Sequence, residues 1–104
     1  KTYIAYCWHS VPGYSAFGTY QGGKTTFVHL GFRPAFLMVK CVPDNGQWNP
    51  YYPWAIFDNA RSPYNHTNPP VYANRDLVEN VRGGDSSTYG TSNTLDFLSN
   101  GFKL

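Results

Sequence analysis

Hydrophobic and polar positions alternate with a period of two along much of this chain, most clearly in TYIAYCWH, residues 2–9. Successive side chains of a β-strand point to opposite faces of its sheet, so this period predicts strands. No stretch sustains the 3.6-residue period of an amphipathic helix. The pattern predicts about seven short strands, within residues 2–9, 14–20, 25–30, 35–42, 54–58, 71–72 and 94–104.

The most apolar of these segments is Ala35–Val42, which is hydrophobic on both faces as far as Lys40. It follows a Gly-Phe-basic triplet, Gly31–Arg33, that recurs as Gly101–Lys103. Pro34 cannot donate a hydrogen bond to a sheet ladder, so it marks the start of the strand. A strand that is apolar on both faces is typical of the middle of a sheet. We therefore expect residues 35–42 to form a central strand that is buried on both sides.

Proline, glycine and asparagine mark the connections between the strands. Val11-Pro12-Gly13 and residues 21–24 are predicted turns, because these residue types adopt the backbone angles that turns need. Longer loops are expected at 43–53, 59–70 and 82–93, with one turn of helix from Asn74 as N-cap to Glu79. The fold is thus predicted to be all-β: a two-sheet antiparallel β-sandwich of jelly-roll or lectin-like type, with long Pro/Asn/Gly loops. A β-barrel is the lesser alternative.

Composition narrows the function further. The 104 residues suit a single β-sandwich module, 1–104, which is either a unit on its own or a fragment of a longer polypeptide. Charged residues make up 13% of the chain, against about 25% in an ordinary soluble domain, and aromatic residues reach 18%. Such a chain is not disordered. Its surface must be rich in Tyr, Asn, Ser, Thr and Gly, as in a sugar or protein binder or a subunit covered by neighbours.

Two classes of partner are not expected. The net charge is only +2, and no basic run lies among the aromatic residues, so the sequence gives no reason to expect nucleic acid. No apolar segment reaches the roughly 18 residues that a membrane-spanning helix needs, so membrane insertion is not expected either.

The two cysteines, Cys7 and Cys41, form no CxxC pair, and the three histidines do not stand at ligand spacing around them. We therefore expect no metal centre. Two states of the cysteines are open at this point. They are either reduced thiols in strands or, if their strands are neighbours, a Cys7–Cys41 disulfide.

Catalytic chemistry is not apparent in the acidic residues, which are Asp44, Asp58, Asp76, Glu79, Asp85 and Asp96. Most of them lie in turns, where aspartate commonly binds its own backbone, and no pattern pairs two of them across a cleft. His9 and Ser10 are adjacent, so in a strand they would point to opposite faces. The expectation is a protein that is not an enzyme and uses no cofactor.

Asp58 and Arg61 flank one turn and are predicted to form a structural ion pair across it. The oxygens of Asp44–Gly46 and of Asp58–Asn59 offer the kind of ligands that calcium prefers. Ordinary Asx turns are the simpler interpretation of both segments.

The aromatic residues of two Asn- and Pro-rich loops carry the remaining candidate site. Sugar rings stack on aromatic faces while neighbouring amides bind the hydroxyl groups, so this composition suits a carbohydrate site. The candidate residues are Trp48, Tyr51, Tyr52, Trp54 and Tyr64. Alternatively, the same rings roof one end of the sandwich or fill a subunit interface.

Five strings carry a resemblance to a known family, and they occur in the order YIAYCWHSVPGYSAFGTYQG, GFRPAFLMVK, FDNARSPYN, YAN and LDFLSNGFKL. Together they resemble a repeated domain of predicted virion and tail-fibre proteins of tailed bacteriophages, which often also carry concanavalin A-like lectin or glucanase domains. Cys41 stands where that family usually has arginine, so any shared role of the position is in doubt. The resemblance brings no catalytic residues with it.

What the resemblance implies is a structural or adhesive module at the surface of a virion, in a tail fibre or surface appendage. The implied partners are copies of the chain, other virion proteins and host-surface glycans. Alternatives are a capsid-surface decoration protein and a carbohydrate-binding lectin module.

The candidate strands at the two ends of the chain, TYIAYCWH and LDFLSNGFKL, carry few of the charges and prolines that usually block a free sheet edge. We therefore expect the chain to function as part of an oligomer, with a strand supplied by a neighbouring copy or module.

Overall fold

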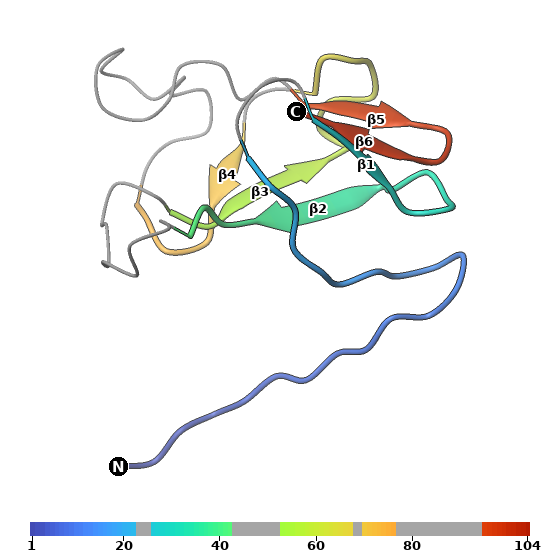
Figure 1. The fold of residues 1–104 in the computed structure, drawn as a ribbon. Coiled ribbons are helices and arrows are strands. Elements are labelled where there is room, and N and C mark those ends of the chain that lie inside the picture. The colour runs from blue at the N-terminus through green and yellow to red at the C-terminus, as the bar shows by residue number, and fades with distance from the viewer. Residues whose placement is uncertain (23–25, 43–52, 68–69, 77–94) are drawn as a thin grey trace.

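The computed structural model describes residues 1–22, 26–42, 53–67, 70–76 and 95–104, and in these residues it contains six β-strands and no helix. The strands form two antiparallel sheets of three strands each (Figure 1). The first sheet has the order β1-β6-β5, with β1 at Phe27–His29, β5 at Asp96–Leu98 and β6 at Gly101–Lys103. The predicted all-β fold with two antiparallel sheets is confirmed.

The second sheet has the order β2-β3-β4, with β2 at Phe36–Val39, β3 at Ala55–Asp58 and β4 at Val71–Tyr72. In register, Phe36 lies opposite Asp58, and Ala55 lies opposite Tyr72. Consecutive strands along the chain, β1 and β2, therefore belong to different sheets. The jelly-roll or lectin-like connectivity stays a prediction, since segments 43–52 and 77–94 lie outside the described residues.

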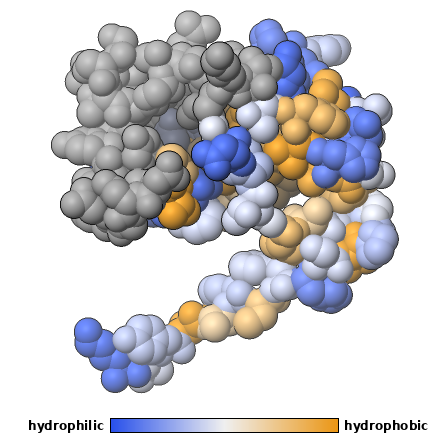
Figure 2. Space-filling model, viewed as in Figure 1, coloured by the Kyte–Doolittle hydropathy of each residue, from blue (hydrophilic) through white to orange (hydrophobic). Residues whose placement is uncertain are grey.

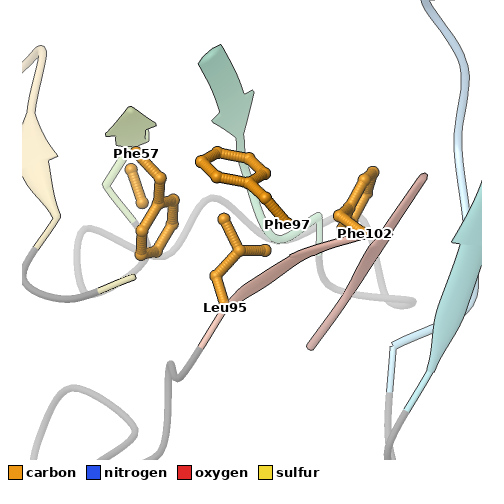
Figure 3. Packing of buried hydrophobic residues seen from close by; sticks show 5 residues of the cluster. Phe57, Leu95, Phe97 and Phe102 are labelled. Atoms are coloured by element: carbon orange, nitrogen blue, oxygen red, sulfur yellow. The ribbon is translucent and has the colours of Figure 1, made fainter. Parts of the chain in front are cut away.

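The hydrophobic core lies between the two sheets and draws on both. Ala55 and Phe57 of β3 face a group from the other sheet and its flank, which comprises Leu95, Phe97 and Phe102. Figure 3 shows the labelled side chains of this group converging. Each ring that is removed from water adds roughly 25 cal/mol per Å² of buried apolar surface, so this small cluster holds the sheets together.

The prediction that residues 35–42 form a central strand buried on both faces is wrong. In the part of the sheet that the structure describes, β2 is an edge strand and β3 lies in the middle. Leu37 and Val39 pack on the core, whereas Phe36 is 59% exposed and Met38 43% exposed. Apolar residues on both faces therefore do not mark burial here, because only one face of β2 meets the other sheet.

The strands expected at 2–9 and 14–20 are also absent. Residues 1–14 are all exposed, and the only strand-like pairing in this part of the chain is an isolated bridge between Val11 and Ser15. Alternation supplies the two faces of a strand, but a strand also needs a neighbour for its backbone hydrogen bonds. Among the described residues of this chain, none pairs with residues 2–9.

The remaining expectations divide in two. Residues 95–104, in the last segment predicted to contain strands, form a hairpin in which Leu98 pairs with Gly101 across Ser99 and Asn100. The helical turn predicted beyond Asn74 runs out of the described residues after Asp76, and the loops at 43–52 and 82–93 lie outside them. Cys7 and Cys41 are both free and exposed, so the structure has the reduced thiols and not the disulfide, but neither thiol lies in a strand as expected.

Phe57→Ala is expected to destabilise the fold by about 3–5 kcal/mol, because it removes a ring that is 1% exposed and joins the two sheets. The matched control is Phe36→Ala, on the exposed face of β2, which should cost well under half as much. Urea unfolding followed by tryptophan fluorescence measures both. Equal losses for the two variants would show that the core is not at Phe57.

Gly101→Ala should destabilise the protein by about 1–3 kcal/mol or more, as overpacking does. Gly101 pairs with His29 where β6 approaches β1 closely, and a Cβ atom there would overlap the Val28 carbonyl oxygen and lie 3.2 Å from the His29 Cα. Gly18→Ala is the control, since no atom lies within 4 Å of a Cβ at that position. A melting temperature that falls as little for Gly101→Ala as for Gly18→Ala would contradict the close approach.

Candidate interaction surface

The N-terminal arm, defined here as residues 1–10, runs away from both sheets (Figure 1). Its large side chains face solvent, from Tyr3 at 82% exposed to Trp8 at 72%. Figure 2 shows hydrophobic residues along an extension that stands clear of the rest of the molecule. Tyr6 and Trp8 stack with their ring centroids 6.2 Å apart. A concentration of exposed apolar rings of this kind is typical of an interaction site.

A tight turn sets the direction of the arm. The Tyr14 amide donates to the Val11 carbonyl oxygen at 2.9 Å, and Gly13 has φ +74° after Pro12. Proline followed by a left-handed glycine is the sequence of a type II turn, so the predicted turn at 11–13 is confirmed. Two serine hydroxyls hold its flanks, because Ser15 Oγ donates to the His9 carbonyl and Ser10 Oγ accepts from the Phe17 amide.

Tyr20 joins this N-terminal segment to the core. Its ring meets Phe102 edge to face, with centroids 5.8 Å apart and an interplanar angle of 81°. Burial raises the pKa of the Tyr20 phenol above its ordinary value, and Cys41 adds to the rise. Residues 1–14 therefore extend away from the two sheets as an arm and a turn. Within residues 1–22, Tyr20 is the residue that packs against the core.

One edge of the β1-β6-β5 sheet is covered by the loop that precedes β4. The Asn65 side chain accepts from the Phe97 amide at 3.0 Å and donates to the Phe97 carbonyl oxygen at 3.1 Å. Two residues on, the amide of buried Thr67 donates to the Leu95 carbonyl at 2.7 Å. The Asn65 amide thus takes the place of a peptide group from a neighbouring strand, and the outward groups of β5 are satisfied.

The predicted sugar site is only partly visible. Trp48, Tyr51 and Tyr52 lie outside the described residues. Trp54, 40% exposed, precedes β3, and its amide donates to Asn74 Oδ1. Tyr64, which is 84% exposed, lies in the loop that follows β3. The next residue in that loop, Asn65, binds β5 of the other sheet through its side chain. No ring contact joins these two described members, and the site as a whole stays a prediction.

Asp58 and Arg61 lie together at the end of β3. Arg61 Nε stands 2.5 Å from Asp58 Oδ2, and Arg61 Nη2 donates to the Ile56 carbonyl oxygen at 3.3 Å. Asp58 Oδ1 accepts from the amides of Ala60 and Arg61, which is an Asx turn. Both carboxylate oxygens of Asp58 are therefore used in holding the turn. Asp44–Gly46, the other candidate calcium loop, lies outside the described residues.

A second acidic side chain has a partner that sequence patterns did not reveal. His66 Nδ1 lies 2.7 Å from Asp96 Oδ1, and Asp96 stands opposite Lys103 in the ladder. Thirty residues separate His66 from Asp96, so no local pattern could have indicated the pair. Within the described residues, no three His, Cys, Asp or Glu side chains gather as they would around a metal ion. The same residues contain no helix long and apolar enough to cross a bilayer.

These features describe an all-β protein with one covered sheet edge, an exposed aromatic arm and titratable side chains that serve local structure. The whole chain, residues 1–104, matches the family described as a domain of unknown function, DUF7483, and the protein belongs to that family. No curated protein and no solved structure matches the chain.

Asp58 should make stability depend on pH at the acid end. Hydrogen bonds from the Arg61 backbone and side chain hold the pKa of Asp58 below its ordinary value. A lowered folded-state pKa contributes stability above the unfolded value of about 3.9, and this contribution is lost as the pH falls through the folded value. The stability gap between the wild type and Asp58→Asn should thus be full above pH about 4 and should close below it.

Urea unfolding at a series of pH values measures this gap. The free energy of unfolding of Arg61→Ala should lie between those of the wild type and Asp58→Asn above pH about 4, because the backbone amides of residues 60 and 61 still donate to Asp58. A gap between wild type and Asp58→Asn that is independent of pH would show that the charge on Asp58 contributes nothing.

Proposed function

We propose that this protein is a non-enzymatic structural or adhesive module of a phage virion, in a tail fibre or surface appendage. The observation that carries the proposal is the N-terminal arm. It presents Tyr3, Ile4, Tyr6 and Trp8 to solvent, and the described residues outside the arm do not bury these side chains. Aromatic side chains bury about 150–250 Å² each when they find a partner, so an arm left in water forgoes several kcal/mol of stabilisation. A module that assembles with other chains recovers it.

Low charge supports the same function. Charged residues make up only 13% of the chain, and the exposed hydrophobic residues extend beyond the arm to Phe17, Phe27 and Phe36. Interfaces are depleted of charge and enriched in aromatic residues at their centres. Such a surface suits a subunit that neighbouring subunits cover in a particle.

The fold and the described acidic residues are compatible with a role without catalysis. Asp58 accepts the hydrogen bonds of its Asx turn and pairs with Arg61, and Asp96 contacts His66. The resemblance to repeated domains of phage virion proteins supplies the setting. A decoration protein on the capsid surface would use the same kind of contacts at another place in the particle.

The test is to locate the chain in purified particles of the phage whose genome encodes it. We expect mass spectrometry to find many copies per virion, and gold-labelled antibodies to mark a fibre or appendage in electron micrographs. Label over the capsid would favour the decoration protein. Absence from purified particles would overturn the proposal.

A glycan array separates the adhesive role from the lectin alternative. Sugar binding that is reproducible and lost in Trp54→Ala, but kept in Tyr14→Ala, would assign a carbohydrate site to the predicted cluster. Tyr14 is the matched control because it is an exposed aromatic residue that stands outside that cluster.

A further inference from the structure

We propose that residues 2–9 of one copy of this chain add a strand to the free edge of β2 in a second copy. The inference rests on the proposed structural function and names the contact through which the modules would join. It depends on a donor segment and an acceptor edge for which the described residues of the same chain supply no partner strand.

The donor is built as a strand that has no sheet. Residues 2–9 contain no Asp, Glu, Lys, Arg or Pro, so every amide is able to donate and no charged side chain opposes pairing. Alternation places Ile4, Tyr6 and Trp8 on one face. At a rise of about 3.3 Å per residue, the segment spans roughly 26 Å when extended, which is longer than β2.

The acceptor is the outer edge of β2. The Asn59 amide donates to the Ala35 carbonyl oxygen, and the register of β2 with β3 continues this pairing to Leu37–Phe57 and Val39–Ala55. Residues of an antiparallel edge strand alternate between pointing toward the partner and pointing away. Leu37 and Val39 therefore bond to β3, and the amides and carbonyls of Phe36 and Met38 point away from the sheet.

The side chains beside these free backbone groups are apolar and exposed. Phe36 and Met38 lie on the face of β2 that the core does not cover, and no charged residue occurs from Ala35 to Val39. Natural edge strands are usually blocked by Lys, Pro or a bulge. Here Pro34 and Lys40 stand beyond the two ends of β2, and none of its own residues is of these types. Ile4, Tyr6 and Trp8 would extend the same apolar face. Three rings, Tyr6 and Trp8 of the arm and Phe36 of β2, bury roughly 450–750 Å² together at about 150–250 Å² each, toward the roughly 1,000 Å² that stable interfaces bury.

The other edges are less suitable. The edge of β5 is occupied by Asn65 and Thr67. The described part of β4 is only two residues long. The edge of β1 is shorter than that of β2 and is flanked by the chain's own segment, where Thr26 Oγ1 donates to the Gln21 carbonyl. Among the described strands, β2 offers the longest uncovered edge.

The donor and the acceptor are different surfaces of the same chain, so two copies can exchange arms about a two-fold axis, or copies can join head to tail in a heterologous contact. Every copy then has one arm to give and one edge to fill. Heterologous contacts generate either closed rings or open filaments. Both suit a repeated module of a fibre or appendage.

The experiment mixes two forms of the full chain. One form, Cys41→Ser, carries a nitroxide spin label on Cys7 in the arm, and the other, Cys7→Ser, is ¹⁵N-labelled and has no spin label. Both cysteines are exposed and free, so labelling need not disturb the fold. We expect the strongest loss of amide signal at Phe36–Val39 of the ¹⁵N copy. Strongest loss at Phe27–His29, or no loss, would overturn the proposal.

Variants test the donor and the acceptor separately. Tyr6→Pro in the spin-labelled form should weaken the effect by about tenfold in apparent affinity, which corresponds to about 1.4 kcal/mol. Its control, Thr19→Pro, is an equally exposed position outside the donor and should leave the effect unchanged. Met38→Pro in the ¹⁵N form removes an outward amide without breaking the ladder to β3. Met38→Lys serves the same purpose if Met38→Pro does not fold.

Two further outcomes are decisive. If a chain that carries both labels keeps its signal loss at β2 when diluted with unlabelled protein, the arm folds on its own edge and the proposal is wrong. If virions contain the chain but Tyr6→Pro associates like the wild type, the arm contact fails and the proposed function stands. In the reverse case, amide signal is lost at β2 but the chain is absent from virions. That result would support the arm contact and overturn the proposed function.

Discussion

The structure depends on the contact between Phe57 of β3 and the Leu95, Phe97 and Phe102 side chains of the opposite sheet. Each sheet has three strands of two to four residues, and ladders this small are marginal in water without a hydrophobic face to bury. The close approach of β6 to β1 at Gly101 and the Asn65 amide on β5 both serve to keep the β1-β6-β5 sheet in place against Phe57.

The size of this core explains the character of the surface. Within the described part of the chain, five residues form the buried cluster, whereas the full sequence carries 19 aromatic residues, as its 9 Tyr, 7 Phe and 3 Trp show. A cluster that small cannot enclose so many rings. Those of the N-terminal arm and of the outer face of β2 therefore remain in contact with water. The same chemistry that builds the core is thus left on the surface at two places, a potential donor strand and a potential acceptor edge.

Local sequence was sufficient to predict the structure wherever the conformation of a short segment depends only on its own residues. The strands at 27–29, 36–39 and 55–58 fall inside the predicted segments, and the Pro12-Gly13 turn has the backbone that its residues favour. The Asx turn at Asp58 also needs only the residues next to it. Similarity of sequence does not predict the same conformation in the two Gly-Phe-basic triplets, Gly31–Arg33 and Gly101–Lys103. Gly31 has φ +80° in a turn, while Gly101 lies within β6 against Val28.

The sequence by itself determined the all-β class, the segments in which the six described strands lie and the Pro12-Gly13 turn, because the period of the side chains and the angles of glycine and proline are local properties. Only the tertiary structure decided which strand lies in the middle of a sheet, since the pattern of β2 fits a central strand and its neighbours leave it at an edge. It also decided that Asn65 covers β5 and that residues 2–9 have no partner strand among the described residues of the chain. Both depend on which backbone groups come together in space from segments thirty or more residues apart in the sequence. Hydrogen bonds between such segments leave no period in the sequence.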